Sequence, residues 1–186
     1  FTPFWRNAEQ VFLNQPQSKN YTIKKKNKNY SFFKKCIKPE DILPKQDWYK
    51  KFDKYWEVSE NNSKKILKNL IENKIKDYGT ARDIPSIEGT SKLSPYIKHG
   101  QIHVASIWEK CSKIKSKGIG YRKYINELGW REFSHSLINY FPEFLKGNFR
   151  KEFDKFPWIK NDKFLKSWKR GMTGYPIVDA GMRELY

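Results

Sequence analysis

Apolar residues recur at helical spacing through most of the chain after residue 60. Ser63 can cap a first helix, and Gly79 can close it. The apolar positions that fall on one face of this helix are Ile66, Leu67, Leu70, Ile71 and Ile75. Residues 80–95 break the periodicity and predict a non-helical stretch.

Two longer patterns follow this stretch. The first predicts a helix that Gly118 ends, and its apolar positions are Val104, Ile107, Trp108, Cys111 and Ile114. The second runs from about Tyr121 to Phe141, where Pro142 stops it. Its apolar residues cover most of the circumference, so this helix is expected to be central and buried.

Shorter helices are predicted around Phe164–Trp168 and from Pro176 onward, since proline suits a first helical turn. Nothing in the chain has the alternation of a strand, and the expected fold is mainly α. Two glycines in the segment GMTGYP, before the proline-started helix, predict a tight turn.

Residues 1–57 have a different pattern. The segment FTPFWR fits the end of a strand or the start of a loop, and a polar, lysine-rich stretch with scattered prolines follows. We expect a long linker that wraps a neighbouring domain. Disorder is the alternative, although the aromatic residues between Trp48 and Trp56 argue against it locally. The chain begins with Phe1 and stops within a helical pattern, so residues 58–186 are expected to be a helical domain that is incomplete at its C-terminus.

The charge balance favours a polyanionic partner. Lysine and arginine number 38 against 20 acidic residues, which gives a net charge of +18. A solvated, lysine-rich surface is the alternative. Aromatic residues make up 17% of the chain, too many for a disordered basic tail. They suit a packed helical core, and they also suit a surface that stacks on bases.

Other common kinds of site find little support. Cys36 and Cys111 lack metal-ligand spacing and do not indicate a disulfide framework, which fits a reduced, intracellular protein. His99, His103 and His135 have neither metal spacing nor a nucleophile beside them. No apolar run approaches the ~20 residues that a membrane span needs. These patterns argue against a metal centre and a membrane protein.

A polar stripe runs along the predicted helix from Tyr121 to Phe141. Glu127, Trp130, Arg131 and Ser134 stand at i, i+3, i+4 and i+7 on an otherwise apolar helix. Burying a carboxylate and a guanidinium is costly unless they pair or face a ligand. One interpretation is a Glu127–Arg131 ion pair beside a core tryptophan. The other is a site for an extruded base, with an acceptor, a stacking ring and a cation.

The non-helical stretch holds a candidate anion site. In the segment GTSKLS, from Gly89 to Ser94, hydroxyls and free backbone N–H groups can surround a phosphate, and Lys92 adds charge. A capped turn before the helix-like SPYIKHG would explain the same residues without a ligand.

Five segments occur in a specific order: FTPFWR, RDIPSIEGTSKLSPYIKHGQI, NELGWREFSHSL, FPW and GMTGYPIVDAGMREL. Together they resemble the photolyase/cryptochrome family, most closely the class I photolyases that act on cyclobutane pyrimidine dimers (CPDs). The resemblance covers residues 1–6 and nearly everything from Tyr78 onward. It implies an α/β antenna domain that this chain lacks, a long interdomain loop, and the N-terminal part of an all-helical domain that holds FAD.

The resemblance also implies roles for individual residues. Tyr124 stands where many relatives have a tryptophan near the flavin. The tyrosine ring is aromatic too and could pack against the flavin in its place. Lys146 matches a position that contacts a folate antenna in some relatives, so a folate or other antenna chromophore is a second implied cofactor. The implied FAD contacts are Tyr78, Thr90, Ser91, Lys92, Leu93, Ser94, Tyr124 and Arg131.

For DNA, the resemblance implies that Arg82 contacts the backbone and that the segment with Glu127, Trp130, Arg131 and Ser134 faces a flipped-out dimer. Glu127 would hydrogen-bond the lesion, and Trp130 would pack against it. Trp158 matches the solvent-side end of a tryptophan chain that re-reduces the flavin. Packing of Trp158 against Pro157 at the edge of the core is the alternative.

The implied activity is that of deoxyribodipyrimidine photo-lyase, a carbon–carbon lyase. It repairs pyrimidine dimers in DNA by blue-light-driven electron transfer from reduced FAD, here expected of a cytoplasmic, DNA-associated monomer. A cryptochrome-type photoreceptor is the alternative within the family. Glu127 and Trp130 favour repair, because animal cryptochromes and (6-4) photolyases typically carry glutamine at the first position and plant cryptochromes generally lose the second ring. A basic helical module without flavin would leave the GTSKLS and GYPIVDAGMREL segments unexplained.

Overall fold

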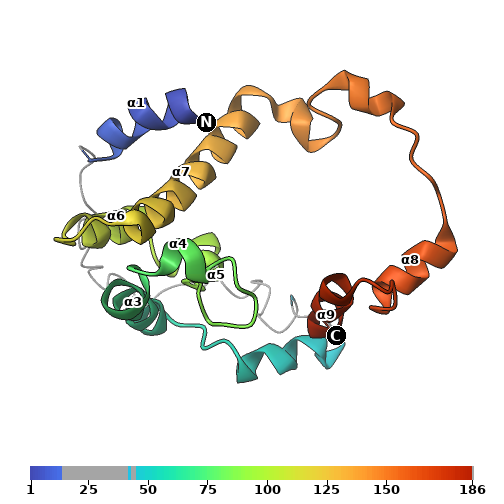
Figure 1. Cartoon of the computed structure of the whole chain (residues 1–186), viewed down its shortest axis with the longest axis horizontal. Helices are drawn as coiled ribbons and strands as arrows, with labels where there is room; N and C mark the ends of the chain where they lie inside the picture. The colour runs from blue at the N-terminus through green and yellow to red at the C-terminus, as the bar shows by residue number, and fades with distance from the viewer. Residues whose placement is uncertain (14–41, 43–44, 186) are drawn as a thin grey trace, which may run out of the picture. The chain divides into compact units, whose positions relative to one another are not determined.

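Helices make up the regular secondary structure of the described part of the chain. The computed structural model describes residues 1–13, 42 and 45–185 (Figure 1). No residue in these ranges belongs to a strand, which confirms the mainly α fold expected from the sequence. The chain divides into two compact parts, Phe1–Leu137 and Ile138–Tyr186.

The order of elements can be followed by colour in Figure 1. From the N-terminus they are α1 (Thr2–Leu13), the 3-10 helix η2 (Asp47–Lys54), α3 (Glu60–Asn69), the π-helical turn η3 (Leu70–Lys74), α4 (Tyr78–Ala81), α5 (Ser94–Lys98), α6 (Val104–Ser112) and α7 (Ile119–Tyr140). After α7 come the 3-10 helices η4 (Pro142–Leu145) and η5 (Lys151–Lys155), then α8 (Asp162–Lys169) and α9 (Pro176–Leu185).

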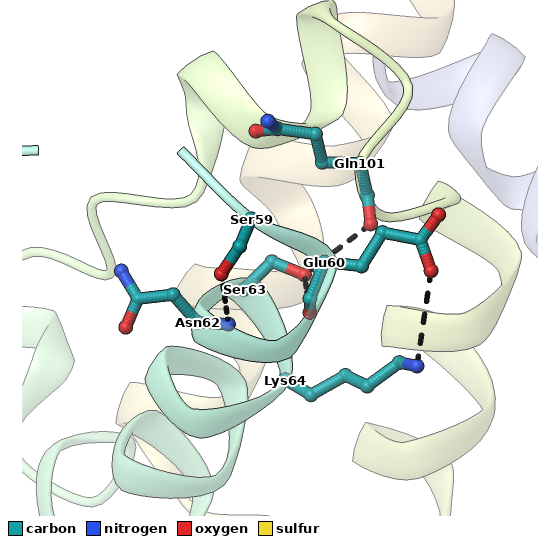
Figure 2. Close-up of polar contacts among 6 residues, drawn as sticks. All are labelled: Ser59, Glu60, Asn62, Ser63, Lys64 and Gln101. Carbon is teal, nitrogen blue, oxygen red and sulfur yellow. Dashed lines mark hydrogen bonds and ion pairs between the residues drawn. The ribbon is translucent and has the colours of Figure 1, made fainter. Parts of the chain in front are cut away.

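Ser59, rather than Ser63, caps α3. The Ser59 side chain accepts a hydrogen bond from the Asn62 backbone N–H at 3.0 Å (Figure 2). Ser63 lies inside the first turn and is fully buried, and its Oγ donates to the carbonyl oxygen of Glu60 at 2.7 Å and to that of Gln101 at 3.3 Å. The expected cap was therefore one turn too late, because a serine that faces the core resembles a capping serine in sequence.

The helix expected to run to Gly79 ends earlier. At η3 the Ile75 N–H bonds the Leu70 carbonyl oxygen at 2.8 Å, five residues back instead of four. Leu70 and Ile75, the two residues that this hydrogen bond joins, are both buried. Gly79 lies inside the short helix α4 and closes nothing.

Helix α6 follows its predicted pattern. It buries Val104, Ile107, Trp108 and Cys111, and burial raises the pKa of the Cys111 thiol to about 12. The helix ends at Ser112, where the Ser112 hydroxyl donates to the Glu109 carbonyl oxygen at 2.8 Å. The expected end at Gly118 was therefore too late.

Helix α7 has nearly the predicted bounds, but only its first half is buried. Its buried residues all lie between Gly120 and Gly129, and the residues after Gly129 are half-buried or exposed. The expectation of a wholly buried helix was therefore wrong for its second half. Apolar side chains around the whole circumference did not distinguish a buried turn from an exposed one.

The N-terminal segment is a helix and not a strand end or loop. Trp5 in α1 is only 7% exposed, and its ring meets Trp108 of α6 edge-on with centroids 5.7 Å apart. Gly129 of α7 lies so close to the Trp5 ring that a Cβ there would be 2.7 Å from it. The first residues of the chain therefore share a core with α6 and α7, while the boundary at residue 57 stays a prediction.

The core of the first part joins residues from α1 to α7. Its largest members are aromatic, so ring packing supplies much of the buried apolar area. The buried hydrophobic residues are Trp5, Leu67, Leu70, Ile75, Tyr78, Leu93, Tyr96, Ile102, Val104, Ile107, Trp108, Cys111, Tyr121, Tyr124, Ile125 and Leu128.

The second part contains a hydrogen-bonded turn just before α9. Gly171 and Gly174 have φ values of +61° and +86°, a region that L-residues with side chains rarely adopt. The buried Asp179 carboxylate accepts hydrogen bonds from the Thr173 N–H at 2.8 Å, the Thr173 hydroxyl at 2.6 Å and the Gly174 N–H at 3.0 Å. The tight turn expected from GMTGYP is therefore present, and one carboxylate holds it.

We expect Asp179→Asn to lower the free energy of unfolding at neutral pH but to have little effect in acid. The hydrogen bond from the Thr173 hydroxyl, followed by that from the Thr173 N–H, lowers the pKa of Asp179. Its contribution is therefore complete above the ordinary aspartate pKa of about 3.9 and is lost as the pH falls through the lower folded-state value. Denaturant unfolding at several pH values measures this difference.

The matched control is Asp53→Asn, because Asp53 is an exposed aspartate of η2. This variant should unfold like the parent at every pH. A difference between parent and Asp179→Asn that stayed constant down to strong acid would contradict the role of the charged carboxylate.

Candidate functional site

A hollow of about 490 Å³ lies in the first part of the chain. This volume falls within the range typical of small-molecule and cofactor sites, roughly 300–1,000 Å³. Residues from α4, the turn before α5, α5 itself and α7 meet there, together with a tryptophan that precedes α3. The lining residues are Trp56, Tyr78, Thr90, Ser91, Lys92, Ser94, Ile97, Tyr124, Glu127, Leu128 and Arg131.

The turn before α5 depends on a close backbone approach. A Cβ on Gly89 would lie 2.1 Å from the carbonyl oxygen of Ala81, so only glycine fits beneath α4. Lys92 has a φ of +53°, and the Ser91 hydroxyl accepts from the Leu93 N–H at 3.3 Å. The Leu93 side chain is 1% exposed and belongs to the core, so only its backbone can face a ligand.

Two tyrosines form an aromatic corner of the hollow. The rings of Tyr78 and Tyr124 meet edge-on, with centroids 5.1 Å apart and an angle of 86°. Burial raises the pKa of both hydroxyls. Both phenols therefore stay protonated at neutral pH and can donate a hydrogen bond.

The carboxylate of Glu127 pairs with a residue from another helix. Arg82, just after α4, forms an ion pair with Glu127. Its Nε also lies 3.5 Å from the carboxylate of Asp83. Its guanidinium also lies 5.6 Å from the centroid of the Tyr78 ring. The hydrogen bond to Glu127 raises the pKa of Arg82 further. The two residues implied for DNA backbone and lesion are therefore in direct contact.

Arg131 does not form the ion pair that the helical spacing left open. Its Nη1 instead bonds the carboxylate of its neighbour Glu132. Since Glu127 is held by Arg82, the first turn of the polar stripe is tied to the end of α4 rather than to the next turn of α7.

Trp130 is not a core tryptophan. Its side chain is 47% exposed, and the ring stacks on Phe1, with centroids 3.8 Å apart and planes 9° apart. Phe133 contacts the ring edge-on at 5.8 Å, and the Ser134 hydroxyl donates to the Trp130 carbonyl oxygen at 2.8 Å. One face of the indole is therefore supported by aromatic residues, an arrangement that suits a stacking platform.

Two further residues named from the sequence lie in the second part of the chain. Trp158 is 79% exposed, and its ring contacts Phe156 with centroids 4.7 Å apart. Within that part, the ring is therefore not packed into a core. Lys146, at the end of η4, is exposed. The electron-transfer and antenna roles of these two residues stay predictions.

The sequence did not indicate Trp56, Ile97 or Leu128 as site residues. Trp56 fell within the expected linker, and no local motif marks it. The next residue, Glu57, is held by a residue far away in the sequence: the Tyr96 hydroxyl donates to the Glu57 carbonyl oxygen at 2.9 Å. The same hydroxyl accepts from the Asn62 side-chain amide at 2.9 Å. Long-range contacts of this kind leave no periodic signal in the sequence.

Neither a metal cluster nor a membrane-spanning element was found in the ranges that the structure covers. No three His, Cys, Asp or Glu side chains there come together as metal ligands. None of the helices described above combines the length and the apolar character that crossing a bilayer requires.

The chain is similar in sequence to known proteins. Residues 124–186 match a family described as the FAD binding domain of DNA photolyase. Over its whole length the chain is 36% identical to a deoxyribodipyrimidine photo-lyase of Agrobacterium fabrum, and it covers 39% of that protein. A protein of the same name from Vibrio cholerae is 32% identical over the whole chain, which covers 40% of it.

A solved structure agrees with these sequences. It is the crystal structure of a bacterial class III photolyase from Agrobacterium tumefaciens, with a TM-score of 0.68 and 39% sequence identity. The match covers 77% of this chain and 30% of that one. Residues 124–186 carry part of the FAD-binding domain of the photolyase family, and the chain is similar to photolyases over its whole length.

These photolyase relatives refine the interpretation of the sequence in two ways. The expectation of a class I enzyme is not specifically supported, because the solved photolyase is of class III. The chain also spans less than half the length of the photolyases it matches.

Proposed function

We propose that the hollow binds FAD and that the full-length protein repairs pyrimidine dimers in DNA under blue light. One observation carries this proposal. Residues from three separate sequence segments, each implied to contact the flavin, line the same hollow: Tyr78, then Thr90, Ser91, Lys92 and Ser94, then Tyr124 and Arg131. The relatives named deoxyribodipyrimidine photo-lyase support repair rather than signalling.

The residues present fit FAD in chemical character. Thr90, Ser91 and Ser94 offer hydroxyls, and Lys92 offers a cation for the phosphates. The edge-on rings of Tyr78 and Tyr124 offer an apolar corner for the planar parts of the cofactor. When bound and reduced, FAD supplies the light-driven electron donor, while the protein binds, orients and shields it.

The DNA side of the proposal uses the residues next to this hollow. A dimer cannot react inside the duplex, so the lesion is turned out of the stack into a pocket. Glu127 lines the hollow and would accept a hydrogen bond from the lesion, while Trp130 would stack on it. Arg82 and Arg131 would contact phosphates, and Ser134 lies on the same stripe. The net charge of +18 would strengthen association with DNA.

The test is a repair assay with the full-length protein. Purified protein with chemically reduced flavin is mixed with ultraviolet-irradiated oligothymidylate and held in blue light or in darkness. We expect dimers to disappear only in the light. Bound FAD without repair would indicate a photoreceptor of the cryptochrome type, and a protein that binds DNA but no flavin would contradict the proposal altogether.

For the Arg82 contact, we expect Arg82→Ala to weaken binding to undamaged and dimer-containing DNA alike. The slope of log K against log salt should become shallower by about 0.9, the amount for one lost phosphate contact. Titrations at several salt concentrations measure this slope. Arg122→Ala removes an arginine of α7 that is 70% exposed in its side chain, and it is the control. A loss confined to damaged DNA would contradict a backbone role.

For Trp158, we expect the Phe substitution to slow light-driven reduction of oxidised FAD strongly while leaving repair by pre-reduced enzyme intact. Phenylalanine keeps most of the volume but is a much poorer electron donor than indole. Because the side chain is 79% exposed, little stability should be lost. Flavin absorbance during illumination measures the first activity, and the dimer assay measures the second.

Trp168→Phe is the control for this experiment, since Trp168 of α8 lies in the same part of the chain and is 47% exposed. It should photoreduce like the parent. Undiminished photoreduction in the Trp158 variant would remove this residue from the electron path, and an equal loss of both activities would indicate structural damage instead.

A further inference from the structure

A second, smaller hollow adjoins the first. It measures about 190 Å³ and shares Trp56, Ser91 and Lys92 with the first hollow. Its remaining lining mixes polar and apolar residues: Tyr55, Asn62, Ile66, Asn69, Leu70, Lys74, Glu88 and Tyr96. Because three residues line both hollows, one elongated ligand can occupy both.

Lys74 brings a second cation to this place. It is the last residue of the π-helical turn η3 and is half-buried. Its Nζ donates to the carbonyl oxygen of Thr90 at 3.5 Å, so the ammonium lies against the turn that carries Lys92. A lysine of η3 therefore lies beside a loop sixteen residues further along the chain.

The carboxylate of Glu88 lies close to Lys92 and interacts electrostatically with Lys74. Lys92 Nζ lies 2.5 Å from the carboxylate of Glu88. The hydrogen bond from Lys92 is the main reason that the pKa of Glu88 is lowered, and the charge of Lys74 contributes in the same direction. Two ammonium groups and one carboxylate leave a net positive charge at this wall of the hollow, which an anion with more than one negative charge can neutralise better than Glu88 does.

We propose that Lys74 and Lys92 form a two-lysine clamp for a diphosphate, and that Glu88 is the internal counter-ion that the diphosphate displaces. The inference rests on the proposed function, because the diphosphate would be that of FAD. The flavin would then occupy the larger hollow, and the chain of phosphates would pass Ser91 into the smaller one. Trp56 stands where the two hollows meet. The clamp thereby selects the dinucleotide over a flavin without phosphates.

The test compares three single substitutions in the full-length protein after removal of its flavin. Lys74→Gln removes the second cation, and Glu88→Gln removes the competing carboxylate. Lys68→Gln makes the same charge change at an exposed lysine of α3 whose Nζ is 3.9 Å from Glu72 and which lines neither hollow. Affinities for FAD, riboflavin and inorganic pyrophosphate are measured by fluorescence titration and by competition.

We expect Lys74→Gln to bind FAD about tenfold more weakly, the loss of one charge-assisted contact, while its affinity for riboflavin is unchanged. Lys68→Gln should match the parent with both flavins. Glu88→Gln should bind pyrophosphate and FAD several times more tightly, since no internal anion then competes. These opposite signs at two neighbouring residues distinguish a clamp from general damage.

Equal FAD affinities in Lys74→Gln and Lys68→Gln would overturn the clamp while leaving the proposed function intact. An equal loss of riboflavin and FAD in Lys74→Gln would also overturn it, because the effect would then be structural. If the parent bound no FAD, the proposed function would fail, and pyrophosphate would decide the inference alone. Thermal stabilisation by pyrophosphate that Lys74→Gln abolishes would support the clamp, and its absence in the parent would exclude it.

Discussion

Gly89→Ala is expected to abolish flavin binding at ordinary concentrations and to lower the stability of the protein by about 1–3 kcal/mol. The added Cβ would meet the Ala81 carbonyl oxygen at 2.1 Å, the Ala81 carbonyl carbon at 2.3 Å and the Arg82 nitrogen at 2.9 Å. These are backbone atoms that cannot rotate away. The turn must therefore move off α4, which separates Ser91 and Lys92 from Tyr78.

Gly118→Ala is the control for this substitution. A Cβ at Gly118 meets nothing within 4 Å, so this variant should keep both flavin and stability. The flavin content of the purified proteins and their thermal unfolding, measured without flavin, give the two readouts. A Gly89→Ala protein that held flavin as tightly as the parent would show that the turn before α5 does not form the cofactor site.

Trp130→Ala is expected to lose discrimination of dimer-containing DNA by about 1–3 kcal/mol, the usual contribution of one base–aromatic stack. The ring is exposed enough to meet a base, and Phe1 and Phe133 support it from within the protein. Trp130→Phe should lose less, because a smaller ring still stacks. Binding to damaged and undamaged duplexes of the same sequence measures the discrimination.

Stability measurements separate this role from simple packing. Removing a fully buried tryptophan costs about 3–5 kcal/mol, but Trp130 is half exposed, so its removal should cost clearly less. Trp48→Ala removes another exposed tryptophan, 57% exposed in η2, and should leave lesion binding unchanged. A large loss of stability with unchanged discrimination would return Trp130 to a purely structural role.

Periodicity predicted the helices well where one face of the helix meets the core. Helix α6 buries Val104, Ile107, Trp108 and Cys111 as its spacing requires. The ends were less accurate, because Ser59 and Ser63 are one turn apart and either could cap. The π-helical turn at Leu70 could not be predicted, because the sequence pattern does not show whether an N–H bonds the carbonyl oxygen four or five residues back.

The candidate site was predictable in part for a similar reason. Residues close in sequence, such as Thr90 to Ser94, could be grouped by inspection. Their meeting with Tyr124 and Arg131 depended on the family resemblance, because helix packing brings these segments together. Trp56, Lys74 and the Arg82–Glu127 ion pair escaped prediction altogether. Each depends on a contact between segments that are far apart in the sequence, and no local sequence pattern predicts such a contact.

The contact between Trp5 and Gly129 has a practical consequence for anyone who shortens or recombines this protein. A helical domain cut at residue 57 would lose α1 and leave a slot beside Trp108, open to water and shaped for an indole. Such a truncated protein would expose apolar surface and aggregate readily. An exchange of N-terminal domains between relatives should therefore keep residues 1–13 with the helices they pack against, and should transfer the tryptophan and the glycine as a pair.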